Sequence, residues 1–213
     1  VKAAYYASRM GISSPLPQTL SLALGSAEVT PLELTSAFGV FANDGIMTVP
    51  YDIIRIEDFE GNTIKENYPK EMQVLSPQTN FIMTNLLQQA CTYGTGWYTR
   101  RIGRPLGGKT GTTNNASDVW FTGFTPDLVT SVWMGYDERV TLGPRRAGGG
   151  VAAPIWTDYI RKALAHTPVL DFQVPDGIVF VNVDPETGLL ASDFSDKAIL
   201  QPFIKGTEPL SYF

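Results

Sequence analysis

The chain has 213 residues, of which 43% are hydrophobic, 11% aromatic and 17% charged, and its formal net charge is −5. This composition argues against intrinsic disorder, and the acidic balance argues against nucleic acid as a partner. A single cysteine excludes an internal disulfide, and a single histidine leaves little material for a histidine-based site, so we expect neither a metal nor a cofactor.

The first predicted elements are helices. Residues 1–10 are expected to form the end of one helix. A second helix begins at Thr30, which can cap the backbone N–H of Glu33 while the Glu33 side chain reaches back. Pro31 fits its first turn, and residues 43–45 end it. The side chains expected on its inward face are Leu34, Ala37, Phe38 and Phe41.

A hairpin and a third helix are predicted next. Residues 49–59 and 62–66 alternate as strands around a glycine-containing turn. The helix begins at Ser76 and runs to about Cys91, which we interpret as a small buried side chain. Its periodicity places one set of residues on a common face: Phe81, Ile82, Asn85, Leu86 and Gln89.

Three short strands follow, over residues 106–113, 118–125 and 128–136. The tight turn between the last two predicts an antiparallel meander. A helix over residues 152–165 is expected to pack on this sheet, and residues 178–183 form one more strand. The packing side chains of that helix are expected to be Ile155, Trp156, Tyr159 and Ile160.

The most informative stretch is residues 106–113, which combine an ammonium group with hydroxyls and glycines. Read from Gly103, it fits the spacing G-x-x-x-x-G-K-[ST] of a phosphate-binding P-loop. That loop needs an apolar strand before it and a helix after it. Residues 97–102 and 112–117 provide neither, so we interpret this match as accidental.

The alternative is Lys-Thr-Gly on a β-strand, a motif of β-lactamases and penicillin-binding proteins. Alternation would turn Lys109, Gly111 and Thr113 to one face and the residues between them to the other. The glycines would let another backbone approach, so a peptide could dock along the strand edge. Lys109 would supply positive charge, and the threonine hydroxyls could bind a carboxylate.

Basic residues gather around this stretch. Residues 72–117 contain no Asp or Glu but include Arg100, Arg101, Arg104 and Lys109. A local cationic field attracts an anionic ligand group even in an acidic protein. For the three arginines, a solvated loop explains the pattern equally well. For Lys109, whose neighbours are small and polar, we favour contact with a ligand.

Several segments carry a family resemblance. They are residues 23–33, 41–45, 92–96, 109–113, 118–126 and 184–191. Together they resemble the C-terminal part of the transpeptidase domain of bifunctional (glycosyltransferase and transpeptidase) penicillin-binding proteins. Related hydrolases share Lys-Thr-Gly but not the other segments. The resemblance implies an α+β fold of the β-lactamase/transpeptidase type, with an antiparallel sheet flanked by helices, here lacking the N-terminal strands and the nucleophile helix.

The resemblance also implies roles for individual residues. Lys109, Thr110 and Gly111 would form the catalytic Lys-Thr-Gly element. Thr110, Thr112 and Thr113 would bind the terminal carboxylate of a peptidoglycan stem peptide, or its β-lactam equivalent. The backbone N–H of Thr112 would be one of two oxyanion donors. No metal or cofactor is implied.

The family's serine motifs are missing from this sequence. No serine has Lys three residues later or Asn two residues later. We therefore expect the nucleophilic serine outside this chain, and no acyl transfer by the chain alone. Its partners would be stem peptides, β-lactams and the N-terminal remainder of the same protein. We expect it to act on the periplasmic face of a membrane, to which a segment outside this chain would anchor the protein.

The composition shifts toward proline, glycine and acids from Pro168. We therefore expect residues 1–167 to be the C-terminal portion of the transpeptidase domain and residues 168–213 an extension packed on it. The alternative function is a non-catalytic peptide-binding or interaction module of the same fold.

Overall fold

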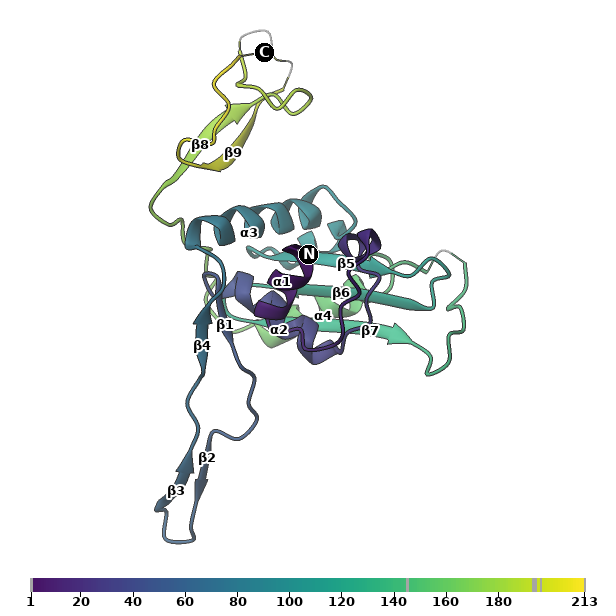
Figure 1. The fold of residues 1–213 in the computed structure, drawn as a ribbon, viewed down its shortest axis with the longest axis vertical. Helices are drawn as coiled ribbons and strands as arrows, with labels where there is room; N and C mark the ends of the chain where they lie inside the picture. Colours follow the sequence, from purple (N-terminus) through teal and green to yellow (C-terminus); the bar gives the residue numbers. More distant parts are fainter. Residues whose placement is uncertain (1, 145, 193–194, 196, 213) are drawn as a thin grey trace.

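The computed structural model describes residues 2–144, 146–192, 195 and 197–212. Its centre is a three-stranded antiparallel sheet in the order β5 (Gly107–Thr112), β6 (Asp118–Phe124) and β7 (Val129–Gly135) (Figure 1). The register pairs Lys109 with Thr122, and Thr122 with Ser131. All three strands lie within the predicted ranges, because alternation and turn residues both specify them.

One face of the sheet packs against α4 (Ala152–Ala163). Trp156 and Ile160 are fully buried, and the Phe121 ring lies 5.0 Å from the Trp156 ring. The Trp156 indole N–H donates to the Thr130 carbonyl at 3.1 Å, which satisfies its one buried polar atom. The helix prediction is confirmed, but Ile155 and Tyr159 are exposed, so the buried face is narrower than predicted.

The other face packs against α2 (Pro31–Ala42). The predicted capping box is present, with Thr30 and Glu33 bonded reciprocally. Glu33 also accepts hydrogen bonds from Ser13 and Ser14, and thereby holds the preceding loop against the helix. Bonds from the Ser13 hydroxyl, the Thr30 backbone and Ser14 lower the pKa of Glu33.

Short elements precede α2. The first helix, α1, covers Lys2–Arg9, and the 3-10 helix η1 covers Leu20–Leu24. Val1, which the sequence places on the first helix, lies outside the described residues. Helix α1 has no buried residue, so it lies on the surface of the molecule.

Helix α3 (Pro77–Thr92) runs beside β5, with Ser76 as its N-cap (Figure 1). Four of the five residues predicted to share a face are half-buried and Leu86 is exposed, whereas the fully buried polar positions are Asn80 and Thr84. Both polar side chains donate to the carbonyl of Phe41, in the last turn of α2. A hydrophobic periodicity cannot reveal polar residues buried to satisfy another helix's terminus.

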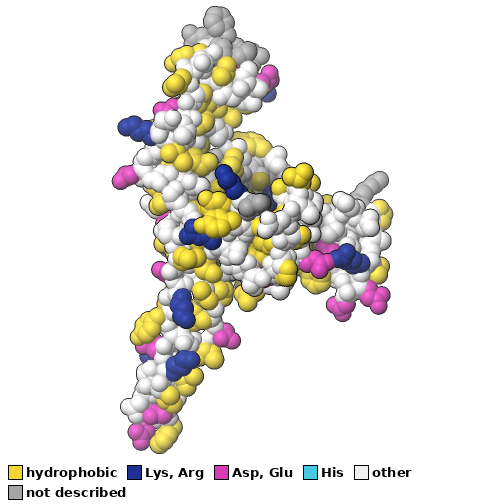
Figure 2. Space-filling model, viewed as in Figure 1, with side chains coloured by type: hydrophobic (Ala, Val, Ile, Leu, Met, Phe, Trp, Pro, Cys, Tyr) yellow, Lys and Arg dark blue, Asp and Glu magenta, His cyan; other side chains and the backbone are white. Residues whose placement is uncertain are grey.

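A long two-stranded arm projects from the body (Figure 1). At its base β1 (Ile46–Thr48) pairs with β4 (Glu71–Gln73), and near its tip β2 (Arg55–Glu57) pairs with β3 (Thr63–Glu66). The predicted hairpin is confirmed around its turn, but its strands are shorter than predicted. Figure 2 shows hydrophobic side chains along the arm between charged ones. Phe59, at the tip, is 97% exposed.

The last part of the chain forms a second ribbon, in which β8 (Ile178–Val183) pairs with β9 (Ile199–Ile204). This ribbon lies against α3 on the side away from β5 (Figure 1). The Phe81 and Phe180 rings meet edge to face at 6.2 Å, and the Gln89 amide donates to the Gln201 side chain at 2.8 Å. The partner strand β9 carries no strong sequence signal and was not predicted.

Candidate functional site

The candidate site lies on β5, an edge strand of the central sheet. The backbone N–H of Thr113 donates to the Asp118 carbonyl on β6 at 3.1 Å. Hydrogen-bonding direction alternates along an antiparallel strand, so the backbone groups of Thr110 and Thr112 point away from β6. The predicted strand geometry of the Lys-Thr-Gly element is therefore present, with backbone donors directed to an edge.

Helix α3 covers only the start of that edge. The Cys91 thiol donates to the Gly108 carbonyl at 3.6 Å. Burial raises the pKa of the Cys91 thiol to about 11, so it is not a nucleophile at neutral pH. Beyond Gly108 the strand becomes accessible, since Lys109 and Thr112 are exposed and Thr110 is half-buried.

Lys109 places its ammonium along the same edge. Its Nζ donates to the Thr110 carbonyl at 2.9 Å and lies 3.4 Å from the Thr110 hydroxyl. The Thr110 carbonyl is one of the outward-directed groups of β5, so the ammonium lies where a docking peptide would approach. A positive charge here can attract and hold an anionic group.

The two threonine hydroxyls of β5 are held by segments distant in sequence. The Thr110 Oγ1 lies 2.6 Å from the Thr95 Oγ1, in the turn after α3. The Thr112 Oγ1 accepts a hydrogen bond from the backbone N–H of Gly148 at 3.1 Å. The glycines at residues 94–96 predict a turn near the rim of the site, and those at 148–150 predict a loop, but the sequence does not reveal the contacts of Thr95 and Gly148 with β5.

Thr113 differs from the other threonines. It lies just past β5, and its hydroxyl accepts from the backbone N–H groups of Ser117 and Asp118, each at 3.0 Å. It also exchanges a hydrogen bond with the Ser117 hydroxyl at 2.9 Å. The Thr113 side chain therefore closes the turn between β5 and β6, and a ligand would compete with those bonds.

The three arginines of the acid-free window do not converge on Lys109. The Arg104 guanidinium donates to the carbonyls of Leu164, Thr167 and Pro168, at 2.5, 2.5 and 2.8 Å, and so caps the C-terminus of α4. Arg101 lies 4.2 Å from the centre of the Tyr98 ring. These contacts explain two of the arginines without a ligand.

The P-loop interpretation fails on both flanks. Residues 97–102 form the 3-10 helix η2 (Trp97–Ile102), and the residues after Lys109 continue as a β-strand. Within the described part of the chain, no cluster of His, Cys, Asp and Glu suits a metal ion. No helix among the described residues is long and apolar enough to span a membrane.

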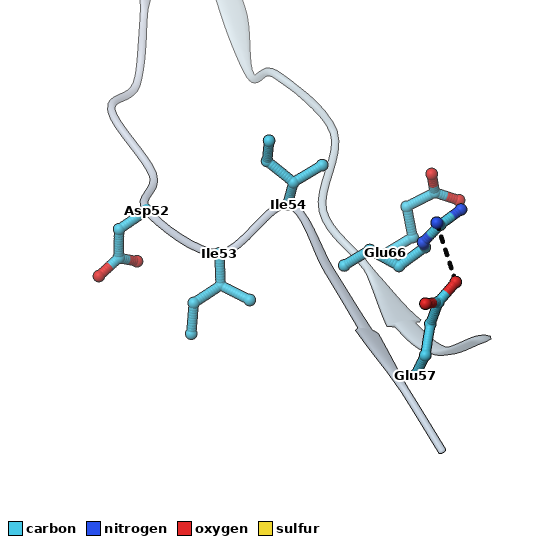
Figure 3. A pocket seen from close by; sticks show the side chains of 6 residues that line it. Asp52, Ile53, Ile54, Glu57 and Glu66 are labelled. Carbon is cyan, nitrogen blue, oxygen red and sulfur yellow. Dashed lines mark ion pairs between the residues drawn. The ribbon is translucent and has the colours of Figure 1, made fainter. Parts of the chain in front are cut away.

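An open concavity of about 550 Å³ lies on the arm (Figure 3), away from β5 (Figure 1). Figure 3 shows Ile53 and Ile54 pointing to opposite sides of the chain, so they form no common apolar floor. Arg55 and Glu57 form an exposed ion pair at 2.9 Å on its wall. Its lining residues are all exposed to solvent, and we assign it no role in the site.

Two family models match the chain. The penicillin-binding protein transpeptidase domain matches residues 13–161, and the C-terminal domain of penicillin-binding protein 1A matches residues 174–213. The chain belongs to the penicillin-binding protein transpeptidase family. Penicillin-binding protein 1A of Aquifex aeolicus is 41% identical over 189 residues, which cover 89% of this chain and 26% of that protein.

Solved structures of penicillin-binding proteins have the same fold. Penicillin-binding protein 1A from Haemophilus influenzae is 31% identical, with a TM-score of 0.90, over 99% of this chain and 37% of that one. Mycobacterium tuberculosis PonA1, solved in complex with penicillin V, is 24% identical with a TM-score of 0.68 over 79% of this chain and 51% of that one. The predicted α+β, β-lactamase/transpeptidase-like fold is confirmed, and the chain spans about a quarter of its curated relative.

Proposed function

We propose that this chain is part of a peptidoglycan D,D-transpeptidase and supplies the strand that binds the C-terminal end of the stem peptide. The observation that carries the proposal is the accessible edge of β5, where the Lys109 ammonium bonds the outward-directed Thr110 carbonyl and the Thr112 side chain is exposed. A peptide ending in a carboxylate has the complementary groups: backbone donors and acceptors, and a terminal anion.

The proposed reaction is acyl transfer through a serine outside this chain. The serine oxygen bonds to the carbonyl carbon of the penultimate D-alanine, the peptide C–N bond breaks, and the terminal D-alanine leaves with the serine's proton. An amine of a neighbouring stem peptide then attacks the ester. A new peptide bond forms, and the proton lost by the amine returns to the serine oxygen.

The residues of β5 would act at separate points of this reaction. Lys109 would raise the local positive potential and assist proton transfer, and Thr110 and Thr112 would hold the carboxylate. Gly111 allows close approach of the substrate backbone. The Thr112 N–H, which alternation turns outward, would be one oxyanion donor; losing such a donor typically costs about 3–4 kcal/mol of transition-state stabilisation. Thr113 would bind the carboxylate only if its hydrogen bonds within the turn between β5 and β6 broke.

The rest of the proposal concerns partners and place. We propose that β-lactams bind at the same edge as mimics of the D-Ala-D-Ala end; PonA1, which shares the fold, was solved in complex with penicillin V. The protein would act on the periplasmic face, anchored outside this chain. Residues 1–167 would form the transpeptidase portion and residues 168–213 an extension on α3. The N-terminal remainder of the same protein would supply the serine and the strands that pair with β7.

Labelling with a fluorescent penicillin, followed by intact-mass analysis, tests the proposal. We expect one covalent adduct on the full-length protein, none on the 213-residue chain, and a large loss of labelling in the full-length Lys109→Ala variant. Arg101→Ala, a basic residue stacked on Tyr98, is the matched control and should label normally. An adduct on the isolated chain would refute the serine assignment. Peptide binding without any adduct on the full-length protein would favour a non-catalytic module.

A further inference from the structure

The glycine segment before α4, residues 147–150, crosses β5 and β6 on the α4 side of the sheet. A Cβ at Gly148 would overlap the Trp120 carbonyl oxygen and lie 2.8 Å from the Gly111 carbonyl oxygen. A Cβ at Gly149 would overlap the Thr95 carbonyl oxygen. At Gly150 the nearest atom would be 3.8 Å away, an ordinary contact. The first two positions therefore exclude a side chain, and the third does not.

This close approach has a consequence for Thr112. A hydroxyl has one hydrogen to donate and two lone pairs to accept. The Gly148 N–H occupies one lone pair at 3.1 Å, and the Thr112 side chain is otherwise exposed. The hydroxyl hydrogen is therefore available to an incoming acceptor, and donation by Gly148 strengthens it as a donor.

The same segment also bears on Thr110. Gly149 packs on the Thr95 carbonyl, and the Thr95 hydroxyl lies 2.6 Å from the Thr110 hydroxyl. Gly94 and Gly96 shape this turn, because a Cβ at Gly94 would lie 2.7 Å from the Ala90 carbonyl oxygen. The glycine segment therefore holds both hydroxyls of β5, the Thr112 hydroxyl directly and the Thr110 hydroxyl through Thr95.

We propose that Gly148 and Gly149 are positioning residues, which orient the hydroxyls of Thr112 and Thr110 as donors toward the substrate's terminal carboxylate. The inference deepens the proposed function and rests on it. Neither glycine touches the substrate; each acts through a threonine. This positioning should therefore raise the acylation rate of ligands that carry the carboxylate and have little effect on ligands in which that group is blocked.

The test compares benzylpenicillin with its methyl ester, which lacks the anion, as acylating agents of the full-length protein. Gly148→Ala should lower the second-order acylation rate for benzylpenicillin by about tenfold, the value of roughly one hydrogen bond to a charged group. The rate for the methyl ester should change much less. Gly150→Ala is the matched control and should leave both rates unchanged.

A second pair of variants covers the case in which Gly148→Ala does not fold. Thr95→Val should reduce the selectivity for benzylpenicillin over its ester, and Thr95→Ser should restore it. Equal losses for both compounds would mean that the segment only supports the fold, and would overturn the inference. Unchanged rates in Gly148→Ala and Thr95→Val would also overturn it, with the proposed function intact. If the wild-type protein is not acylated at all, the proposed function fails first.

Discussion

Substitution of Arg104 tests whether this arginine stabilises the fold or helps to bind an anionic ligand. Its guanidinium bonds three carbonyls at the end of α4, so Arg104→Ala should destabilise the fold. The loss of stability should be smaller than the summed energy of three charge-assisted hydrogen bonds. Without Arg104, the Leu164 carbonyl keeps the Thr167 hydroxyl as a partner at 3.2 Å, and water can reach the carbonyls of Thr167 and Pro168. We expect about 2 kcal/mol, the upper value for a cation at a helix C-terminus.

The assay is urea and thermal unfolding of the chain at low concentration, followed by tryptophan fluorescence. A loss of this size corresponds to a Tm decrease of about 4–8 °C for a chain of this length. Arg104→Lys should recover only part of it, because one ammonium cannot reproduce the planar fork. Arg101→Ala, which loses only its contacts with the Trp97 and Tyr98 rings, should cost about 0.5–1 kcal/mol. Unchanged stability of Arg104→Ala, together with impaired penicillin acylation of the full-length variant, would refute this reasoning.

Three further predictions concern the fold around the site. Glu33→Gln should lower Tm at neutral pH, because the folded state lowers the pKa of Glu33 and the ionised carboxylate therefore stabilises the fold. This stabilisation is present above the ordinary pKa of 4.5 and is lost as the pH falls through the folded pKa. The difference in Tm between variant and wild type should therefore shrink in acid. Cys91, with its pKa raised to about 11 by burial, should resist iodoacetamide in the native chain and react after unfolding in urea, as mass analysis would show. Gly108→Ala should cost about 1–3 kcal/mol in urea unfolding, because its Cβ would lie 2.7 Å from the Phe121 ring, whereas Gly111→Ala, with its nearest contact at 3.2 Å, should cost less.

The central sheet and α2 could be predicted because their signals are local. The capping box at Thr30 and Glu33 needs only four consecutive residues, and the three strands are marked by alternation and by turns between them. Lys109 and its neighbouring threonines could be placed on a strand for the same reason. Local chemistry is readable when the partners lie a few residues apart.

The unpredicted parts depend on distant partners. The buried face of α3 follows from Asn80 and Thr84 satisfying the Phe41 carbonyl, about forty residues earlier in the chain. The contacts of Thr95 and Gly148 with β5 depend likewise on how the chain folds back. Gly94, Gly96 and Gly148 predict a turn and a loop, but only the fold shows that their lack of a side chain lets another stretch of backbone pack against them.

The two edges of the central sheet differ in chemistry, and the difference predicts how the isolated chain behaves. At β5 the edge presents an ammonium and hydroxyls. At β7, the Thr125 N–H bonds the Leu128 carbonyl, so alternation turns the backbone groups of Ser131 and Trp133 outward, and Trp133 is 39% exposed. An unpaired edge beside an exposed aromatic side chain favours pairing with another strand.

We therefore expect the 213-residue chain to self-associate as its concentration rises, as sedimentation velocity would detect. Trp133→Lys should reduce this association, because an edge lysine opposes strand addition, whereas Tyr93→Lys, an exposed aromatic away from the sheet, should not. The full-length protein should not associate through this edge if strands of its N-terminal remainder pair with β7. A chain that stays monomeric and cooperatively folded at high concentration would show that β7 needs no partner strand, and would contradict the proposal that further strands of the protein pair with β7.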